Sequence, residues 1–405
     1  MDVSYNLFAA TAPGLAPLAA EELRALGIEP LQVESGGVAF RGPLASVYRA
    51  NLWLRTASRV LARVDEFPVR AFYELDKITR KLPWERFLTP GRTLSLRVTC
   101  RKSRLYHSDA VAERVARAIE ARLGRAGEFS AAAGDDADAT GQESAPLVIV
   151  RLLHDQCTLS VDTSGALLHL RGYRQATAKA PLRETLAAAM VMAGGWTSQY
   201  PVLDSGLRTT DFGPSAPLLD PMCGAGTIPI EAALLARNIA PGLNRRFAFM
   251  DWPGFDEALW ERRLDEARAG VRPAAGPIQA SDRDAGAIEA ALANAARAGV
   301  AGDIEFTQRA LSAIEPPAGP GALITNPPYG VRVGEHDRLR NLYAQLGNVA
   351  RRKLPGWTIA FLSADDALAR GVGVPLQTVF ETSNGGIPVR FLRGVIGHQS
   401  SVIGH

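Results

Sequence analysis

The pattern of apolar and polar positions divides the chain into two parts that differ in the order of their predicted strands and helices. In the first part, short strand-like runs alternate with segments that carry apolar residues at helical spacing. The predicted strands there are residues 5–9, 38–42, 93–100, 147–152 and 157–162. In the second part, which begins near residue 181, apolar helices alternate with short buried strands. The predicted helices are 182–193, 228–236 and 285–298, and the predicted strands are 218–219, 278–282, 304–306, 323–324 and 358–363.

The first part is typical of small α+β domains, and the second predicts a doubly wound α/β sheet. Three further helices are expected in the first part. Residues 15–26 form one, ended by Gly27. Residues 44–61 form another, with apolar residues on one face and arginines around it, namely Arg49, Arg55, Arg59 and Arg63. A third begins with Ser108 as its N-cap.

Residues 131–146 are the one low-complexity stretch of the chain. They consist mainly of Ala, Gly and Asp and have no apolar periodicity. A segment of this kind cannot bury enough apolar surface to order itself, so we predict a variable surface insertion. The domain boundary is expected further on, near residues 165–180.

Length and composition indicate a protein of several domains without a membrane span. A chain of 405 residues and 43.3 kDa is too large for one core, so two or three domains are expected. No apolar run approaches the roughly 18 residues that span a bilayer, and residues 1–5 do not resemble a signal peptide. The three cysteines are scattered and the six histidines show no metal-ligand spacing. We therefore expect a cytoplasmic protein with no structural metal and no membrane partner.

Charge is distributed unevenly along the chain. The net charge is only +3, but residues 41–107 contain 15 Lys and Arg against 5 Asp and Glu, a local balance of +10. A basic module in a nearly neutral chain favours a polyanionic partner, although a solvated basic face is the alternative.

A basic loop lies between the predicted strand 93–100 and the helix that follows it. Phosphate-binding and stacking side chains gather there at a helix N-terminus, whose free N–H groups also attract phosphate. We predict RNA or DNA contact through Arg101, Lys102, Ser103, Arg104 and Tyr106.

A rigid polar tip follows the predicted strand 323–324. Pro327 and Pro328 stop the strand and fix the backbone, and Asn326 is forced into an extended conformation because a proline follows it. The Asn326 side-chain carbonyl and the Pro327 main-chain carbonyl can accept hydrogen bonds from an exocyclic NH2 group, while the Tyr329 ring can stack on a flat base. This segment predicts recognition of a planar molecule that carries an amino group.

Two other strand ends in the second part carry informative residues. Asp220 leads into a loop with Gly224 and Gly226, which lacks both the Gly-Lys-Ser/Thr ending of a phosphate loop and the dinucleotide fingerprint. Asp282 ends the next strand, where a carboxylate can take both hydroxyls of a ribose. Together with the Asn326 tip, these residues favour S-adenosyl-L-methionine as cofactor and methylation of an amine.

The segments at residues 219–232 and 325–330 resemble those of the THUMP-domain class I RNA methyltransferases that act on guanine N2, of the bacterial 23S rRNA type. Residues 51–61, 102–107, 171–174 and 180–189 are also similar to this family. The resemblance implies a ferredoxin-like domain at residues 1–60, a THUMP RNA-binding domain at 61–168 and a Rossmann-like methyltransferase domain at 169–405. We expect a monomer, although the sequence does not give the oligomeric state.

The resemblance implies a set of site residues as well. The catalytic residues are Asn326, Pro327, Pro328 and Tyr329. The cofactor-binding residues are Leu182, Thr185, Asp220, Pro221, Met222, Cys223, Gly224, Gly226, Thr227, Asp282, Arg283, Leu311 and Asn326. Arg174 and Lys179 join the RNA-binding residues named above. The chain departs from the family at Ala310, where members often carry an acidic residue for the adenine amino group, so main-chain groups are expected to hold the adenine here.

Several alternatives stay open at this point. The same Asn-Pro-Pro-Tyr segment serves adenine N6 methylation and glutamine N5 methylation of release factors, although the basic N-terminal part argues against a protein substrate. The RNA can be rRNA or tRNA. A non-catalytic RNA-binding or ribosome assembly factor is the alternative of another class.

Overall fold

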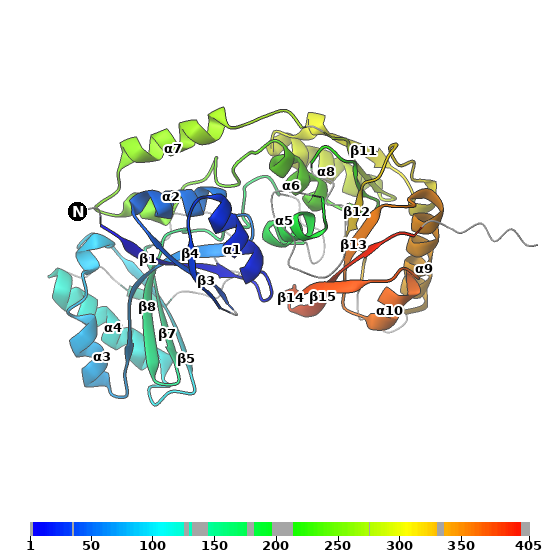
Figure 1. The fold of residues 1–405 in the computed structure, drawn as a ribbon. Helices are drawn as coiled ribbons and strands as arrows, with labels where there is room; N and C mark the ends of the chain where they lie inside the picture. Colours follow the sequence, from blue (N-terminus) through cyan, green and yellow to red (C-terminus); the bar gives the residue numbers. More distant parts are fainter. Residues whose placement is uncertain are drawn as a thin grey trace, which may run out of the picture.

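The structure is a computed structural model that describes residues 3–34, 36–124, 129–131, 145–175, 182–196, 214–274, 276–329 and 336–397. Two sheets organise these residues, one in the N-terminal half of the chain and one in the C-terminal half (Figure 1). The described residues contain no helix that is long and apolar enough to cross a membrane.

The N-terminal sheet has eight strands in the order β2-β3-β1-β4-β8-β7-β5-β6. Its strands are β1 (Tyr5–Thr11), β2 (Pro30–Glu34), β3 (Gly37–Gly42), β4 (Ala57–Pro68), β5 (Leu94–Arg101), β6 (Phe129–Ala131), β7 (Leu147–Leu153) and β8 (Gln156–Asp162). Strand β4 pairs with β1 on one side and with β8 on the other. The expected boundary at residues 60 and 61 therefore falls inside a strand that both N-terminal domains share.

The prediction of one helix over residues 44–61 is wrong. Helix α2 (Leu44–Trp53) ends early, and the chain re-enters the sheet as β4. The buried Glu22 carboxylate accepts hydrogen bonds from the main-chain N–H groups of Arg55, at 2.6 Å, and Thr56, at 3.1 Å. These bonds hold the backbone out of the helix, and the pairing of β4 with two neighbours outweighs the helical spacing of its apolar residues.

The other helices of this half are α1 (Ala16–Ala25), α3 (Phe72–Thr79) and α4 (Ser108–Leu123). Ser108 is not the N-cap of α4, as predicted, but its first helical residue. His107 takes the N-cap position with an extended backbone, and its side chain makes no capping hydrogen bond. Residues 132–144 of the predicted insertion lie outside the described residues.

The C-terminal sheet has seven strands in the order β11-β10-β9-β12-β13-β15-β14. They are β9 (Leu218–Asp220), β10 (Ile278–Asp282), β11 (Ile304–Gln308), β12 (Ala322–Thr325), β13 (Thr358–Ser363), β14 (Gln377–Asn384) and β15 (Ile387–Val395). The first five in this order are parallel, and β15 is antiparallel to both β13 and β14. This arrangement confirms the predicted doubly wound sheet and adds a C-terminal hairpin that was not predicted.

Helices cover both faces of this sheet. Consecutive residues of one strand belong to different cores, since Leu218 packs with one face and Leu219 with the other. The first face carries α5 (Glu184–Ala193), α6 (Thr227–Ala236) and α8 (Ala285–Arg297), and the second carries α9 (His336–Lys353) and α10 (Asp366–Gly371) (Figure 1). Helices α9 and α10 were not predicted.

A segment between α6 and β10 leaves the C-terminal sheet and packs on the N-terminal half. It contains helix α7 (Glu257–Ala269), which lies over α2 in Figure 1. Phe247, Phe249 and Trp260 of this segment are buried in the same core as the residues of the N-terminal sheet. The Tyr48 hydroxyl accepts a hydrogen bond from the Asp256 N–H at 2.9 Å. The two halves therefore share one hydrophobic core across the predicted boundary near residue 168.

Buried polar contacts also join the two halves. Arg171 forms an ion pair with Glu231 at 2.9 Å and donates to the Arg55 carbonyl at 2.8 Å. Arg55 in turn donates to the Ile239 carbonyl at 2.7 Å. Breaking a buried pair of this kind leaves an uncompensated charge, so the junction is fixed by polar as well as apolar contacts.

Candidate active site at the ends of strands β9, β10 and β12

Three adjacent parallel strands bring the predicted site residues to one edge of the C-terminal sheet. Strand β9 lies between β10 and β12, and Leu218 is in register with both Ile278 and Ala322. The carboxyl ends of parallel strands lie at the same edge, which is where open α/β sheets bind ligands. Asp220, Asp282 and Asn326 therefore converge there.

Asp220 is fully buried and links the end of β9 to the end of β12. Its carboxylate accepts hydrogen bonds from the Thr325 hydroxyl at 2.7 Å and the Met222 N–H at 3.2 Å. Burial raises the pKa of Asp220 to about 7, since two neutral donors only partly offset the loss of water around the charge. Thr325 is a site residue that the sequence analysis missed.

The glycine loop between β9 and α6 has two left-handed residues with different surroundings. Gly224 has φ of +51°, and a Cβ added there would meet nothing within 4 Å, so its outer side is open. Gly226 has φ of +82°, and an added Cβ would lie 3.0 Å from the Ala291 Cβ of α8. The Asn294 side chain, also on α8, donates to the Ala225 carbonyl at 2.9 Å and fixes the loop. The loop thus offers an open cradle at Gly224 and close helix packing at Gly226.

Asp282 supports this loop and remains half-buried. One carboxylate oxygen accepts from the Gly224 N–H and the other from the Asp284 N–H, both at 3.0 Å. Each carboxylate oxygen can accept more than one hydrogen bond, so both oxygens keep capacity for a ribose hydroxyl. Arg283, the next residue, is exposed.

The remaining predicted cofactor-binding residues surround these strand ends. Leu182 and Cys223 pack in the apolar core on the α6 face, and Leu311 and Met222 pack in the core on the α9 face. The other members of the set are also buried: Thr185, Pro221 and Thr227. Ala310 lies exposed just before Leu311, in the position where the family often carries an acidic residue.

The tip after β12 contains an unsatisfied acceptor. The Asn326 Oδ1 atom is buried and has no hydrogen-bond partner among the described residues. Such an atom costs about 1–3 kcal/mol when nothing pairs with it. An external donor, such as the amino group of a base, fits this position.

Tyr329 is half-buried and is held from the C-terminal hairpin. Its hydroxyl accepts a hydrogen bond from the Asn384 side-chain amide at 2.7 Å. Burial raises the pKa of Tyr329, and the hydrogen bond from Asn384 partly offsets this effect. Pro327 is buried and Pro328 is exposed. The sequence analysis missed Asn384; the Gly-Gly pair at residues 385 and 386 signals a hairpin turn, but nothing local connects Asn384 with Tyr329.

The predicted RNA-binding loop is exposed on the N-terminal half. The side chains of Arg101, Lys102, Arg104 and Tyr106 are exposed, with Tyr106 at 67%. The Ser103 hydroxyl instead donates to the Arg101 carbonyl and accepts from the Asp155 N–H, both at 3.0 Å. Ser103 therefore shapes the loop, while its neighbours present charge and a ring.

Two further segments meet this loop at the same end of the sheet. Asp155, in the β7–β8 turn, accepts from the Arg104 N–H at 2.7 Å, and its carbonyl accepts from the Val69 N–H at 2.7 Å. Arg70 and the 70% exposed Tyr73 follow Val69 at the start of α3. Both residues were missed because helix α3 was not predicted.

The geometry does not support Arg174 as an RNA contact. Its guanidinium forms an ion pair with Glu184 at 3.2 Å and donates to the Leu182 carbonyl at 2.8 Å, with only 10% of the side chain exposed. Arg174 therefore stabilises the start of α5 through these contacts. Its positive charge is paired with Glu184 and does not face solvent. Lys179 lies outside the described residues.

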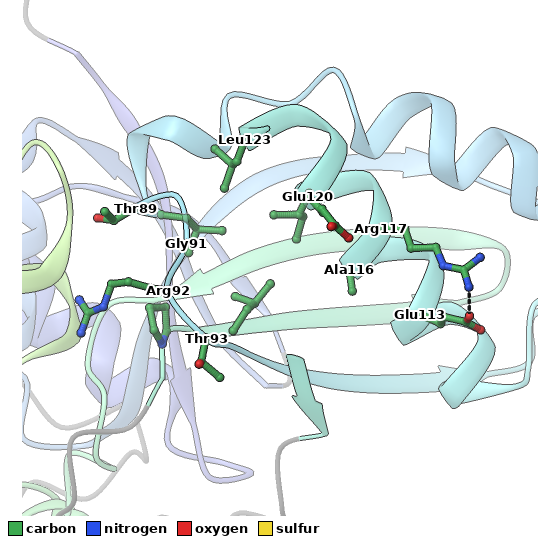
Figure 2. A pocket seen from close by; sticks show the side chains of 13 residues that line it. Thr89, Gly91, Arg92, Thr93, Glu113, Ala116, Arg117, Glu120 and Leu123 are labelled. Carbon is green, nitrogen blue, oxygen red and sulfur yellow. Dashed lines mark hydrogen bonds and ion pairs between the residues drawn. The ribbon is translucent and has the colours of Figure 1, made fainter. Parts of the chain in front are cut away.

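A cavity of about 280 Å³ lies away from these strand ends, between α4 and the loop before β5 (Figure 2). Arg92, Glu113 and Glu120 are among its lining residues. Leu123 and Pro146, which also line it, stand close to the gaps in the described chain. We assign no ligand to this cavity. The described residues also contain no cluster of His, Cys, Asp or Glu that could hold a metal ion.

Comparison with known proteins agrees with this geometry. A family profile described as RMKL-like, methyltransferase domain matches residues 171–205 and 206–389. The RlmL ferredoxin-like domain profile matches residues 6–61, and the THUMP domain profile matches residues 69–162. The junctions between these matches lie in β4 and in the segment after β8.

Individual proteins are similar over nearly the whole chain. The slr0064 protein of Synechocystis, named as an inferred RNA methyltransferase, is 37% identical over 95% of each chain. The ribosomal RNA large subunit methyltransferase K/L of Syntrophotalea carbinolica is 38% identical over 98% of this chain and 55% of its own length. This chain thus spans about half the length of the K/L relatives it matches.

The fold is similar to that of SMU.472, described as an inferred methyltransferase in complex with SAH. The two structures superimpose with a TM-score of 0.82 at 30% identity, covering 98% of this chain and 99% of the other. The profiles, the relatives and the converging strand ends lead to the same assignment. This chain belongs to the RMKL-like methyltransferase family and combines an RlmL ferredoxin-like domain, a THUMP domain and a methyltransferase domain.

Proposed function

We propose that this chain transfers a methyl group from S-adenosyl-L-methionine to the exocyclic N2 amine of a guanine in 23S rRNA, acting as a cytoplasmic monomer without a metal ion. The observation that carries the proposal is the buried Oδ1 of Asn326, which lacks a hydrogen-bond partner in the part of the chain that the structure describes, near the half-buried Tyr329. The similarity to ribosomal RNA methyltransferases K/L supports the choice of substrate.

The residues at the strand ends fit the cofactor. The open side of Gly224 leaves room for a ligand against the main chain, and Asp282 keeps acceptor capacity for a ribose. The similar SMU.472 protein is described as complexed with SAH. When bound, the cofactor supplies an electrophilic methyl group on a sulfonium.

The protein's contribution to the reaction is mainly positioning. The target guanine must leave its stack, which costs roughly a few kcal/mol. This cost is lowest at unpaired or distorted sites. The Tyr329 ring then holds the base face, and the carbonyls of Asn326 and Pro327 accept from the N2 hydrogens. Because the N2 lone pair is delocalised into the ring, the amine is a weak nucleophile, and its orientation accounts for most of the rate gain. A strong base is not required, since proton loss follows attack.

The exposed basic loop supports RNA as the substrate. Arg101, Lys102, Arg104 and the exposed ring of Tyr106 share the loop that leads into the N-terminal end of α4. Cations and helix N-termini bind phosphates, and exposed rings stack on unpaired bases. This cluster can hold a structured RNA while the target base reaches Asn326.

The central test measures methyl transfer from tritiated cofactor to rRNA, tRNA and protein, followed by mass spectrometry of the nucleosides. Incorporation into rRNA as N2-methylguanosine supports the proposal. Label in tRNA would favour a tRNA methyltransferase, and N6-methyladenosine would favour the adenine alternative. Failure to bind cofactor by calorimetry would instead favour a non-catalytic assembly factor.

Replacement of Asn326 by alanine tests the site itself. Asn326→Ala is expected to lower the rate of methyl transfer at least about 100-fold, because the amine loses an orienting acceptor. RNA binding should stay within a few-fold, since the basic loop is untouched. Asn341→Ala, an exposed asparagine on α9, is the matched control. Near-normal turnover in Asn326→Ala would refute the proposed site.

A further inference from the structure

Asn384 occupies the last position of β14 and is 94% buried, with 6% of its surface exposed. Its side-chain amide donates to the Tyr329 hydroxyl at 2.7 Å, a contact between residues 55 positions apart in the chain. Gly385 and Gly386 follow with φ of +57° and +82°, which closes a two-residue hairpin into β15. The position of the Asn384 side chain is therefore set by a tight turn.

Strand β14 is itself held from two sides. Phe380 stacks on Phe391 of β15 with ring centroids 4.9 Å apart. On the other side, Gly14 of the ferredoxin-like domain approaches the strand so closely that an added Cβ would lie 2.2 Å from the Glu381 carbonyl oxygen. Leu15 and Leu18 of the same domain share an apolar core with Phe380. The N-terminal half thus packs against the strand that holds Tyr329.

We propose that Asn384 is a positioning residue that fixes the Tyr329 ring for stacking on the target base, and that the Gly14 loop keeps β14 in place for this purpose. This inference rests on the proposed role of Tyr329 at the site. Asn384 does not touch the reacting atoms and acts only through the Tyr329 hydroxyl.

A tyrosine in this setting needs such an anchor. Tyr329 follows two prolines that fix the backbone, but its own side-chain torsions are free to change. A ring that can swing away from the base loses the benefit of preorganised geometry, and a displacement of about 1 Å can cost about 100-fold in rate.

A double-mutant cycle separates positioning from a general loss of structure. Asn384→Leu keeps the side-chain volume, and Tyr329→Phe keeps the ring. We expect each substitution to lower kcat about 10-fold, with little change in the KM for RNA or the Kd for cofactor. The double variant should be no slower than either single variant, because both remove the same hydrogen bond. Thr382→Val, a buried position two residues earlier on β14, is the matched control and should retain normal kcat.

The outcomes distinguish this inference from the proposed function. Losses that multiply in the double variant, or an Asn384→Leu variant with normal kcat while Tyr329→Ala is slow, would overturn the inference and leave the site proposal standing. Normal turnover in Tyr329→Ala would overturn the role of Tyr329 and the inference with it.

A second variant addresses the case in which Asn384→Leu fails to fold. Gly14→Ala places a Cβ against the Glu381 carbonyl at a position with φ of +77°, so the contact between the Gly14 loop and β14 must change. We expect it to lower kcat while RNA binding by the basic loop stays unchanged. Normal kcat in a folded Gly14→Ala variant would overturn the role of the ferredoxin-like domain in holding β14.

Discussion

At the scale of single residues, Asp220 shows how burial and function are coupled. The carboxyl group has a pKa of about 7 because it is buried with only two neutral hydrogen-bond donors. A folded-state pKa above the unfolded value means that the folded chain holds a proton that the unfolded chain has lost. The stability from this proton is fully present below about pH 4 and is lost as the pH rises through about 7.

Cofactor binding should therefore depend on pH near neutrality. S-adenosylmethionine carries a sulfonium and an ammonium, and positive charge close to Asp220 favours its ionised form. We expect the affinity for the cofactor to fall as the pH is lowered below about 7. We also expect binding at about pH 6.5 to release a proton. Calorimetry in two buffers of different ionisation enthalpy measures this release. Asp220→Asn should bind without proton release, and an equal release in that variant would assign the effect to another group.

The two glycines of the loop after β9 should respond differently to alanine. The left-handed conformation costs either residue about 1–2 kcal/mol once it carries a Cβ. At Gly226 the added Cβ also presses on Ala291, whereas at Gly224 it would project into open space. We expect Gly226→Ala to lower the melting temperature more, and Gly224→Ala to weaken cofactor binding more. The reverse order in melting and calorimetry experiments would contradict this assignment of the two roles.

At the scale of elements, three connections of the N-terminal sheet form the proposed RNA surface. The β5–α4 loop, the β7–β8 turn and the β4–α3 connection meet because β4, β5 and β7 end at the same edge of the sheet. Hydrogen bonds of Asp155 tie the three together. The arrangement brings Arg70 and Tyr73 to the same edge as the β5–α4 loop, whose residues the sequence analysis predicted to contact RNA.

The salt dependence of RNA binding measures this surface directly. Replacing Arg101, Lys102 and Arg104 by alanine should weaken binding to any RNA and lower the slope of log K against log salt by about one for each lost phosphate contact. The exposed Arg262 on α7 provides a control, for which Arg262→Ala should leave the slope unchanged. Filter-binding titrations that give the same slope for the triple variant would rule out this surface as the RNA footprint.

At the scale of the whole molecule, the segment containing α7 joins the two halves through a shared hydrophobic core. Trp260 is buried with Tyr48, Phe247 and Phe249 in edge-to-face contact, although it belongs in sequence to the methyltransferase half. The interface also contains the buried pair of Arg171 and Glu231. A cut near residue 168 would expose this core on both fragments.

Trp260→Ala tests this coupling. Truncation of a buried tryptophan costs about 3–5 kcal/mol of stability. We expect a clear drop in melting temperature and earlier proteolysis of the N-terminal half, to which Trp260 does not belong in sequence. Leu292→Ala, an exposed leucine on α8, should change stability by less than about 0.5 kcal/mol. Loss of stability confined to the C-terminal half would show that the halves fold independently.

Local sequence was sufficient for much of the fold and for most of the site. Strands β9 to β13 and helices α5, α6 and α8 were predictable because their apolar residues follow clean periods and glycines or prolines end several of them, whereas α9, α10 and the β14–β15 hairpin were not predicted. Asp220, Gly224, Asp282 and Asn326 could be placed together because each directly follows a strand, and parallel strands end at one edge. Prediction was wrong at residues 57–61, where pairing with β1 and β8 outweighed a helical pattern.

By itself, then, the sequence determined the class of sheet, the strand ends that form the site and the chemistry of the residues there. Only the tertiary structure decided which partners those residues have. Asn384 reaches Tyr329, Glu184 neutralises Arg174, and Trp260 joins the N-terminal core. The contacts of Asn384 and Trp260 join residues that are distant in sequence, and Arg174 and Glu184 are ten positions apart. Local spacing carries no information about them, because they depend on how complete sheets and domains pack against each other.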